Sequence, residues 1–136
     1  MKGILADVNI EGGMRLLVET FYASAEWSEF WDTLGLLSLN FAQLGLGRRT
    51  PDNIVWQTCQ DNGLVLITGN RNKDDPTSLE AAIRDRLKPD SLPVITVSQA
   101  KSLGVKSNYT AEVGIKILEY LYDIENYRGV GRLYAP

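Results

Sequence analysis

The sequence contains no histidine and a single cysteine, Cys59. Without histidine, the chain has no Ser-His or Cys-His catalytic pair and no imidazole ligand for a metal ion. A single cysteine excludes an internal disulfide, which fits a reducing compartment. Any chemistry must therefore come from carboxylates, amides, hydroxyls, lysine, tyrosine or this one thiol. Of these, carboxylates that bind a hard cation are the simplest choice.

The chain also lacks a basic excess and a long apolar run. Its 14 Lys and Arg residues stand against 17 Asp and Glu, which gives a net charge of −3 and a pI near 4.9. Such a chain lacks the positive field of tight, non-specific nucleic-acid binders, although metal ions could supply positive charge locally. No window approaches the roughly 20 apolar residues of a membrane span, and the first residues do not resemble a signal peptide. We therefore predict a cytoplasmic protein with no membrane attachment.

Short apolar runs alternate with helix-length amphipathic segments along the 136 residues, a length that fits one domain. This alternation predicts an α/β fold, a three-layer α/β/α sandwich with a mainly parallel central sheet. The last residues, 127–136, are expected to form a loose tail. The expected strands are 3–7, 36–39, 64–68 and 94–97, and the expected helices are 14–21, 25–34, 51–60, 78–87 and 107–127.

Two of these helices have recognisable start signals. Thr50 is a candidate cap, with Pro51 at the first helical position. Thr77 and Glu80 have the spacing of a capping box. Cys59 falls on the inner face of the earlier helix, where a buried thiol is more common than a nucleophile.

Polar side chains follow two of the expected strands. Asp7 and Asn9 come after the first strand, and Asn70, Asp74 and Asp75 come after the third. In parallel sheets ligands bind at the carboxyl ends of the strands, so these residues would converge if the two strands are neighbours. The alternative role for Asp7 is structural, in which its side chain caps the following turn.

Two blocks of the sequence resemble the PIN-like superfamily, in particular its small bacterial branch found in toxin–antitoxin-type gene pairs. The first block is ILADVNIEG, with Asp7 at the acidic position of the family pattern and Asn9 near its amide. The second is TPDNIVWQTCQDNGLVLITGNRNKDD, in which Asp52 opens a helix and a strand leads into a polar loop. Together the blocks span 9 and 26 residues of the 136, and the resemblance implies one PIN-like domain over residues 1–136.

This resemblance implies an endoribonuclease that binds Mg²⁺ or Mn²⁺ through clustered carboxylates. Divalent ions acidify the attacking water and neutralise charge on the phosphate, and carboxylates supply the oxygen ligands that these ions prefer. It assigns Asp7 as the central metal ligand and Asp52 as the second, both of them catalytic. The remaining candidates are Asn70, Asp74 and Asp75 for the metal, and Asn9, Arg48, Arg49 and Arg71 for the substrate.

The sequence departs from the family pattern in the polar loop, where Asn70 and Asn72 replace expected carboxylates. An asparagine carbonyl can bind Mg²⁺ but brings no charge, so each replacement weakens cation binding. The asparagines have an alternative role as turn residues, Asp52 as a partner of the helix dipole, and Asp74 with Asp75 as a solvated helix lead-in. A second interpretation is therefore a catalytically degenerate PIN-like protein that acts as a binding or interaction module.

The expected partners follow from these interpretations. RNA and an antitoxin-like protein are candidates, and so is a second copy of the chain. Trp27, Phe30 and Trp31 are spaced on one face of the expected helix 25–34, which suits a contact surface, although such aromatics more often belong to a core. A flavodoxin-like or Rossmann-like binding domain is a weaker third interpretation, because neither EGGM nor LGLGRRT fits a phosphate-binding loop.

Overall fold

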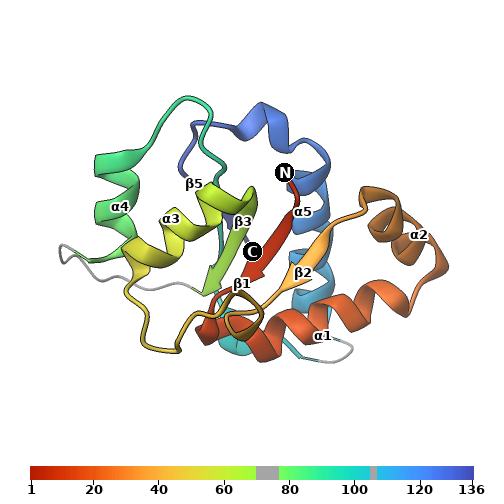
Figure 1. Ribbon diagram of the computed structural model, residues 1–136. Helices are drawn as coiled ribbons and strands as arrows, with labels where there is room; N and C mark the ends of the chain where they lie inside the picture. The colour runs from red at the N-terminus through yellow and green to blue at the C-terminus, as the bar shows by residue number, and fades with distance from the viewer. Residues whose placement is uncertain (70–76, 105–106) are drawn as a thin grey trace.

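The computed structural model describes residues 1–69, 77–104 and 107–136 (Figure 1). A five-stranded sheet with the order β2-β1-β3-β4-β5 forms its centre, and all four strand pairings are parallel. Helices cover both faces, which confirms the predicted three-layer α/β/α class. The strands are β1 Gly3–Ala6, β2 Leu37–Leu39, β3 Leu64–Gly69, β4 Val94–Val97 and β5 Arg132–Ala135.

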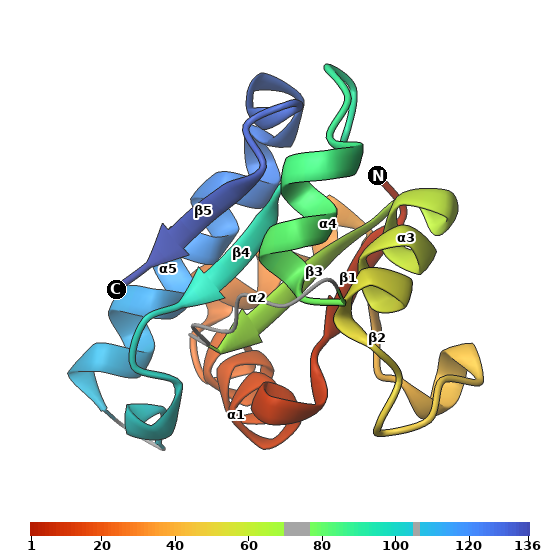
Figure 2. The same cartoon turned by 90° about the vertical axis from the view of Figure 1, so that its left-hand side faces the viewer.

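The helices fall into two groups around the sheet. In Figure 1, α3 and α4 lie on one side of the strands, and α1, α2 and α5 lie on the other. Figure 2 looks onto the α3 and α4 side. None of the helices in the described ranges combines the length and apolar character needed to cross a membrane. Their bounds are α1 Glu11–Tyr22, α2 Ala25–Leu34, α3 Asp52–Asn62, α4 Leu79–Arg86 and α5 Asn108–Tyr122.

The sheet separates two hydrophobic cores, because alternate residues of each strand face opposite sides. Ile4 and Ile67 belong to the core beneath α1 and α5, whereas Leu5 and Leu66 belong to the core beneath α3 and α4. Strands buried on both faces have nearly continuous apolar sequences, which is why their positions could be predicted. Trp31 is buried in the first core, with the other two aromatics of α2 packed against it, so this segment serves mainly as core.

The prediction of a loose tail over residues 127–136 is wrong where the chain forms β5. This strand pairs with β4 over its full length, and the Tyr120 hydroxyl donates a 2.8 Å hydrogen bond to the carbonyl of Tyr134. The expected helix 107–127 is also interrupted, since α5 ends at Tyr122 and a 3-10 turn, Ile124–Tyr127, follows. The final segment is therefore an edge strand of the sheet.

Both predicted helix caps are displaced by one residue. The hydroxyl of Ser78, rather than Thr77, accepts a 3.1 Å hydrogen bond from the backbone N–H of Ala81 at the start of α4. Pro51 occupies the cap position of α3, and the Thr50 hydroxyl instead donates to the carbonyl of Gly47 at 2.7 Å. At the start of α4, Thr77 and Ser78 carry the same local signal, so sequence alone does not select between them.

Candidate functional site at the carboxyl edge of the sheet

A row of polar side chains crosses three neighbouring strands at the carboxyl edge of the sheet. It consists of Asp7 after β1, Thr68 on β3 and Thr96 on β4, and the last two are register partners. All three are buried, at 8%, 3% and 0% exposed. Leu5 and Leu66, two residues earlier on their strands, belong to the core beneath α3 and α4. The row therefore faces those two helices.

Hydrogen bonds fix the first part of this row. The Thr68 hydroxyl donates to the Oδ2 atom of Asp7 at 2.7 Å. The Asn9 side chain accepts a 3.2 Å hydrogen bond from the backbone N–H of Gly69, which ties the turn after β1 to the end of β3. Asn9, predicted to bind substrate, thus has a structural contact with the backbone.

The amino ends of α3 and α4 stand over the same row. Asp52 is the first residue of α3, and Glu80 lies in the first turn of α4. Both line one cavity of about 10 Å³, room for about one water molecule, together with Asp7, Thr68 and Arg132. The structure therefore brings Asp7 and Asp52, the two principal candidates from the sequence, to a common cavity.

Arg132 is the residue of this cavity that sequence reasoning missed most clearly. It comes from β5, and its side chain is only 13% exposed. Its guanidinium donates to the hydroxyl of Thr96 and forms an ion pair with Glu80. The sequence predicts a loose tail for the segment of Arg132 and a capping role for Glu80, so it does not indicate that either residue lines a cavity.

The other predicted site residues lie elsewhere. Arg48 is exposed and contacts Glu11 at 3.5 Å, and Arg49 is exposed as well; neither lines the cavity. Within the described residues, no group of three or more acidic or thiol side chains is close enough to hold a metal ion. The remaining candidates fall in the range 70–76, outside the described residues: Asn70, Arg71, Asp74 and Asp75.

Cys59 of α3 is buried close to this cavity, and its environment makes it a poor nucleophile. Burial raises the pKa of the thiol to about 12, and the negative charge of Asp7 contributes to the same direction. The thiol is 1% exposed and stays protonated at neutral pH. The prediction that Cys59 is a small buried core residue is confirmed.

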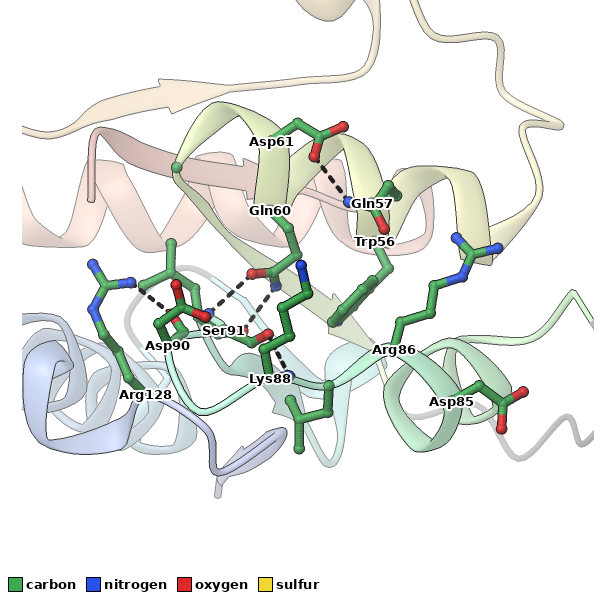
Figure 3. Close-up of a pocket in the computed structure, with 13 residues that line it drawn as sticks. Trp56, Gln57, Gln60, Asp61, Asp85, Arg86, Lys88, Asp90, Ser91 and Arg128 are labelled. Carbon is green, nitrogen blue, oxygen red and sulfur yellow. Dashed lines mark hydrogen bonds between the residues drawn. The ribbon is translucent and has the colours of Figure 1, made fainter.

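A larger cleft, of about 570 Å³, lies at the opposite end of α3 and α4 (Figure 3). Several of its polar groups already bind each other. The Gln60 side chain exchanges two hydrogen bonds with the backbone of Leu92, at 2.9 and 3.0 Å, and Gln57 donates to Asp61 at 2.8 Å. None of the predicted site residues that lie in the described ranges lines this cleft, so we place the candidate site at the carboxyl edge of the sheet.

Comparisons with protein-family models, with characterised proteins and with solved structures gave no match. The resemblance to the PIN-like superfamily therefore stays a prediction that depends on the two sequence blocks. The fold and the cavity are properties of the structure itself.

Proposed function

We propose that this protein is a PIN-like, divalent-metal-dependent ribonuclease in which Asp7 and Asp52 bind the metal. The observation that carries the proposal is that both carboxylates line one cavity at the carboxyl edge of a parallel sheet. This edge is where open α/β sheets bind their ligands. The reaction class, hydrolysis of RNA phosphodiester bonds with Mg²⁺ or Mn²⁺, comes from the sequence resemblance.

The side chains of the cavity suit one divalent cation. Among the described residues that line it, Asp7, Asp52 and Glu80 are acidic, and Arg132, which pairs with Glu80, is basic. Mg²⁺ in phosphate-processing sites is commonly held by one or two carboxylates, with waters and substrate phosphates completing its shell. Within the described residues no group of three or more acidic side chains is close enough to hold a metal ion, so the proposed site depends on two carboxylates, Asp7 and Asp52.

Each protein group has a definable role in this proposal. The hydroxyl of Thr68 holds Asp7 in one orientation through Oδ2. The amino ends of α3 and α4 face the same cavity, and the positive ends of their helix dipoles favour a bound phosphate. A bound divalent ion would lower the pKa of a water and neutralise charge on the phosphate.

An RNA cleavage assay tests the proposal. We expect a labelled single-stranded RNA to be cleaved in the presence of Mn²⁺ and not in EDTA. Asp7→Asn and Asp52→Asn should abolish cleavage, whereas Asp61→Asn should retain it, because Asp61 is exposed at the far end of α3. Cleavage that persists in Asp7→Asn would remove this cavity as the active site.

The second candidate function is a catalytically degenerate interaction module, and one observation favours it. The guanidinium of Arg132 already provides the cavity with a cation, paired with Glu80. Its partner would be RNA, an antitoxin-like protein or a second copy of the chain. This candidate predicts that the folded wild-type protein binds its partner equally well in EDTA and in Mn²⁺, and that no cleavage accompanies binding.

A further inference from the structure

We propose that Arg132 binds a phosphate of the RNA beside the small cavity that Asp7 and Asp52 line, with the phosphate outside the cavity itself. This inference rests on the proposed function and names a substrate-binding residue for it. It predicts that Arg132 contributes to RNA binding but not to metal binding.

The path of the chain places the Arg132 side chain on the correct face of the sheet. Arg132 is the register partner of Val94, and Val94 belongs to the core beneath α3 and α4. Register partners point to the same face. The side chain then extends towards the carboxyl edge, where it reaches Thr96 and Glu80.

The guanidinium has the chemistry that a phosphate site requires. It carries a permanent charge and five N–H donors in a planar fork that matches phosphate oxygens. Its bonds to Thr96 and Glu80 use two donor groups and fix the orientation of the fork. Because the side chain is 13% exposed, solvent screens its charge less than it screens a surface arginine.

The described residues that line the cavity are mainly acidic, so a cation among them would favour the binding of a phosphodiester. Asp7, Asp52 and Glu80 are the carboxylates, and Arg132 is the one cation among the described lining residues. Arg48, which the sequence suggested for this role, lies at an exposed position and is not among the residues that line the cavity.

The alternative role for Arg132 is structural, because its ion pair with Glu80 also joins β5 to α4. The two roles differ in what a substitution does to metal binding. A lost structural contact would impair RNA and metal binding together. A lost phosphate contact would weaken RNA binding, while removal of a positive charge near Asp7 and Asp52 would leave Mn²⁺ binding unchanged or stronger.

Two titrations on the full chain separate these roles. Fluorescence anisotropy measures binding of a labelled single-stranded RNA in Ca²⁺, and calorimetry measures Mn²⁺ binding without RNA. The variants are Arg132→Gln and Arg132→Lys, with Arg128→Gln as the matched control. Arg128 lies just before β5, and its side chain binds Glu125 and the carbonyl of Asp90, away from the cavity.

We expect Arg132→Gln to weaken RNA binding roughly tenfold or more, the effect of one lost charge-assisted hydrogen bond, with Mn²⁺ affinity unchanged or raised. Arg132→Lys keeps the charge but loses the fork, so its RNA affinity should be intermediate. Arg128→Gln should bind RNA as the wild type does. If Arg132→Gln does not fold, the RNA affinity of Arg132→Lys tests the inference instead. An affinity equal to that of the wild type in Arg132→Lys would then overturn the inference.

Three other results would overturn the inference: wild-type RNA affinity in Arg132→Gln, parallel loss of RNA and Mn²⁺ binding, or a wild-type protein that binds no RNA. A different result would contradict the proposed ribonuclease function without contradicting the role of Arg132. If the wild type binds no Mn²⁺ but binds RNA through Arg132, the metal-dependent function is wrong and the assignment of Arg132 stands.

Discussion

The hydroxyl of Thr68 donates a 2.7 Å hydrogen bond to the carboxylate of Asp7, and this bond joins the end of β3 to the end of β1. Both residues are buried, at 3% and 8% exposed. A carboxylate removed from water requires donors to compensate for its lost hydration. The bond therefore contributes to the stability of the fold and also holds Asp7 at the cavity.

Removal of this hydroxyl should cost stability. Thr68→Val keeps the shape of the side chain but leaves Asp7 without its donor, so we expect the free energy of unfolding to fall by about 1.5–3 kcal/mol at neutral pH. Urea denaturation measures the change. Thr58→Val is the matched control, because its hydroxyl donates to the carbonyl of Ile54 within α3. A loss in Thr68→Val no larger than in the control would mean that the bond to Asp7 is unimportant.

Replacement by alanine should change the stability of the fold in opposite directions at two glycines. A Cβ at Gly3 would lie 2.3 Å from the carbonyl oxygen of Leu37, which is backbone of the neighbouring β2, so the strands would have to separate. We expect Gly3→Ala to destabilise the fold by about 1–3 kcal/mol. A Cβ at Gly12 in α1 meets no atom within 4 Å, and Gly12→Ala should stabilise the helix by about 0.5 kcal/mol. Denaturation curves that shift both variants in the same direction would contradict this.

Deletion of residues 132–136 tests whether this segment is an edge strand or a loose tail. The deletion removes all of β5 and exposes an edge of β4, whose Val94 and Val97 are buried. It also removes the acceptor of the Tyr120 hydroxyl. We expect a clearly lower thermal unfolding midpoint than that of the full chain. An unchanged midpoint would restore the original prediction of a tail.

Ionisation of the Cys59 thiol should make the free energy of unfolding depend on pH in the alkaline range. Its pKa is raised from 9.0 to about 12 in the folded protein, so folding favours the protonated thiol. Its contribution to stability is therefore complete below pH 9.0 and is lost as pH rises towards 12. The loss can reach about 1.4 kcal/mol per pH unit.

The matched variant for this effect is Cys59→Ala, which has no thiol to ionise. The difference in unfolding free energy between the wild type and Cys59→Ala should be constant below about pH 8 and should shrink above about pH 9. Urea denaturation at several pH values measures it. A difference that stays constant across this range would show that the thiol ionises equally in both states.

Four of the five strands and most helices could be predicted because their signals are local. An apolar run such as Leu64 to Thr68 has one plausible structure when turn residues bound it. Asp7 could be placed at the carboxyl edge for the same reason, since it follows a predicted strand of a parallel sheet. Asp52 opens a predicted helix, and its assignment to the same site came from the family resemblance.

The features that the sequence did not reveal depend on contacts between distant segments. Arg132 becomes a cavity residue only because β5 pairs with β4, and its partner Glu80 lies 52 positions earlier in the chain. The phase of α3 also depends on such contacts. Ile54 is 46% exposed, whereas Trp56 is 2% exposed and fills the core beneath the helix. Adjacent apolar residues leave the helical phase open, and tertiary packing determines which of them is buried.

Calorimetric titration of Mn²⁺ into the wild-type protein and into Asp7→Asn tests the central claim most directly. The substitution keeps the size of the side chain and removes one of the charges that would bind the cation. We expect one Mn²⁺ to bind per wild-type chain, and we expect the affinity for Mn²⁺ to be at least about tenfold lower in Asp7→Asn. No binding to the wild type, or equal binding to both proteins, would contradict a metal site at Asp7.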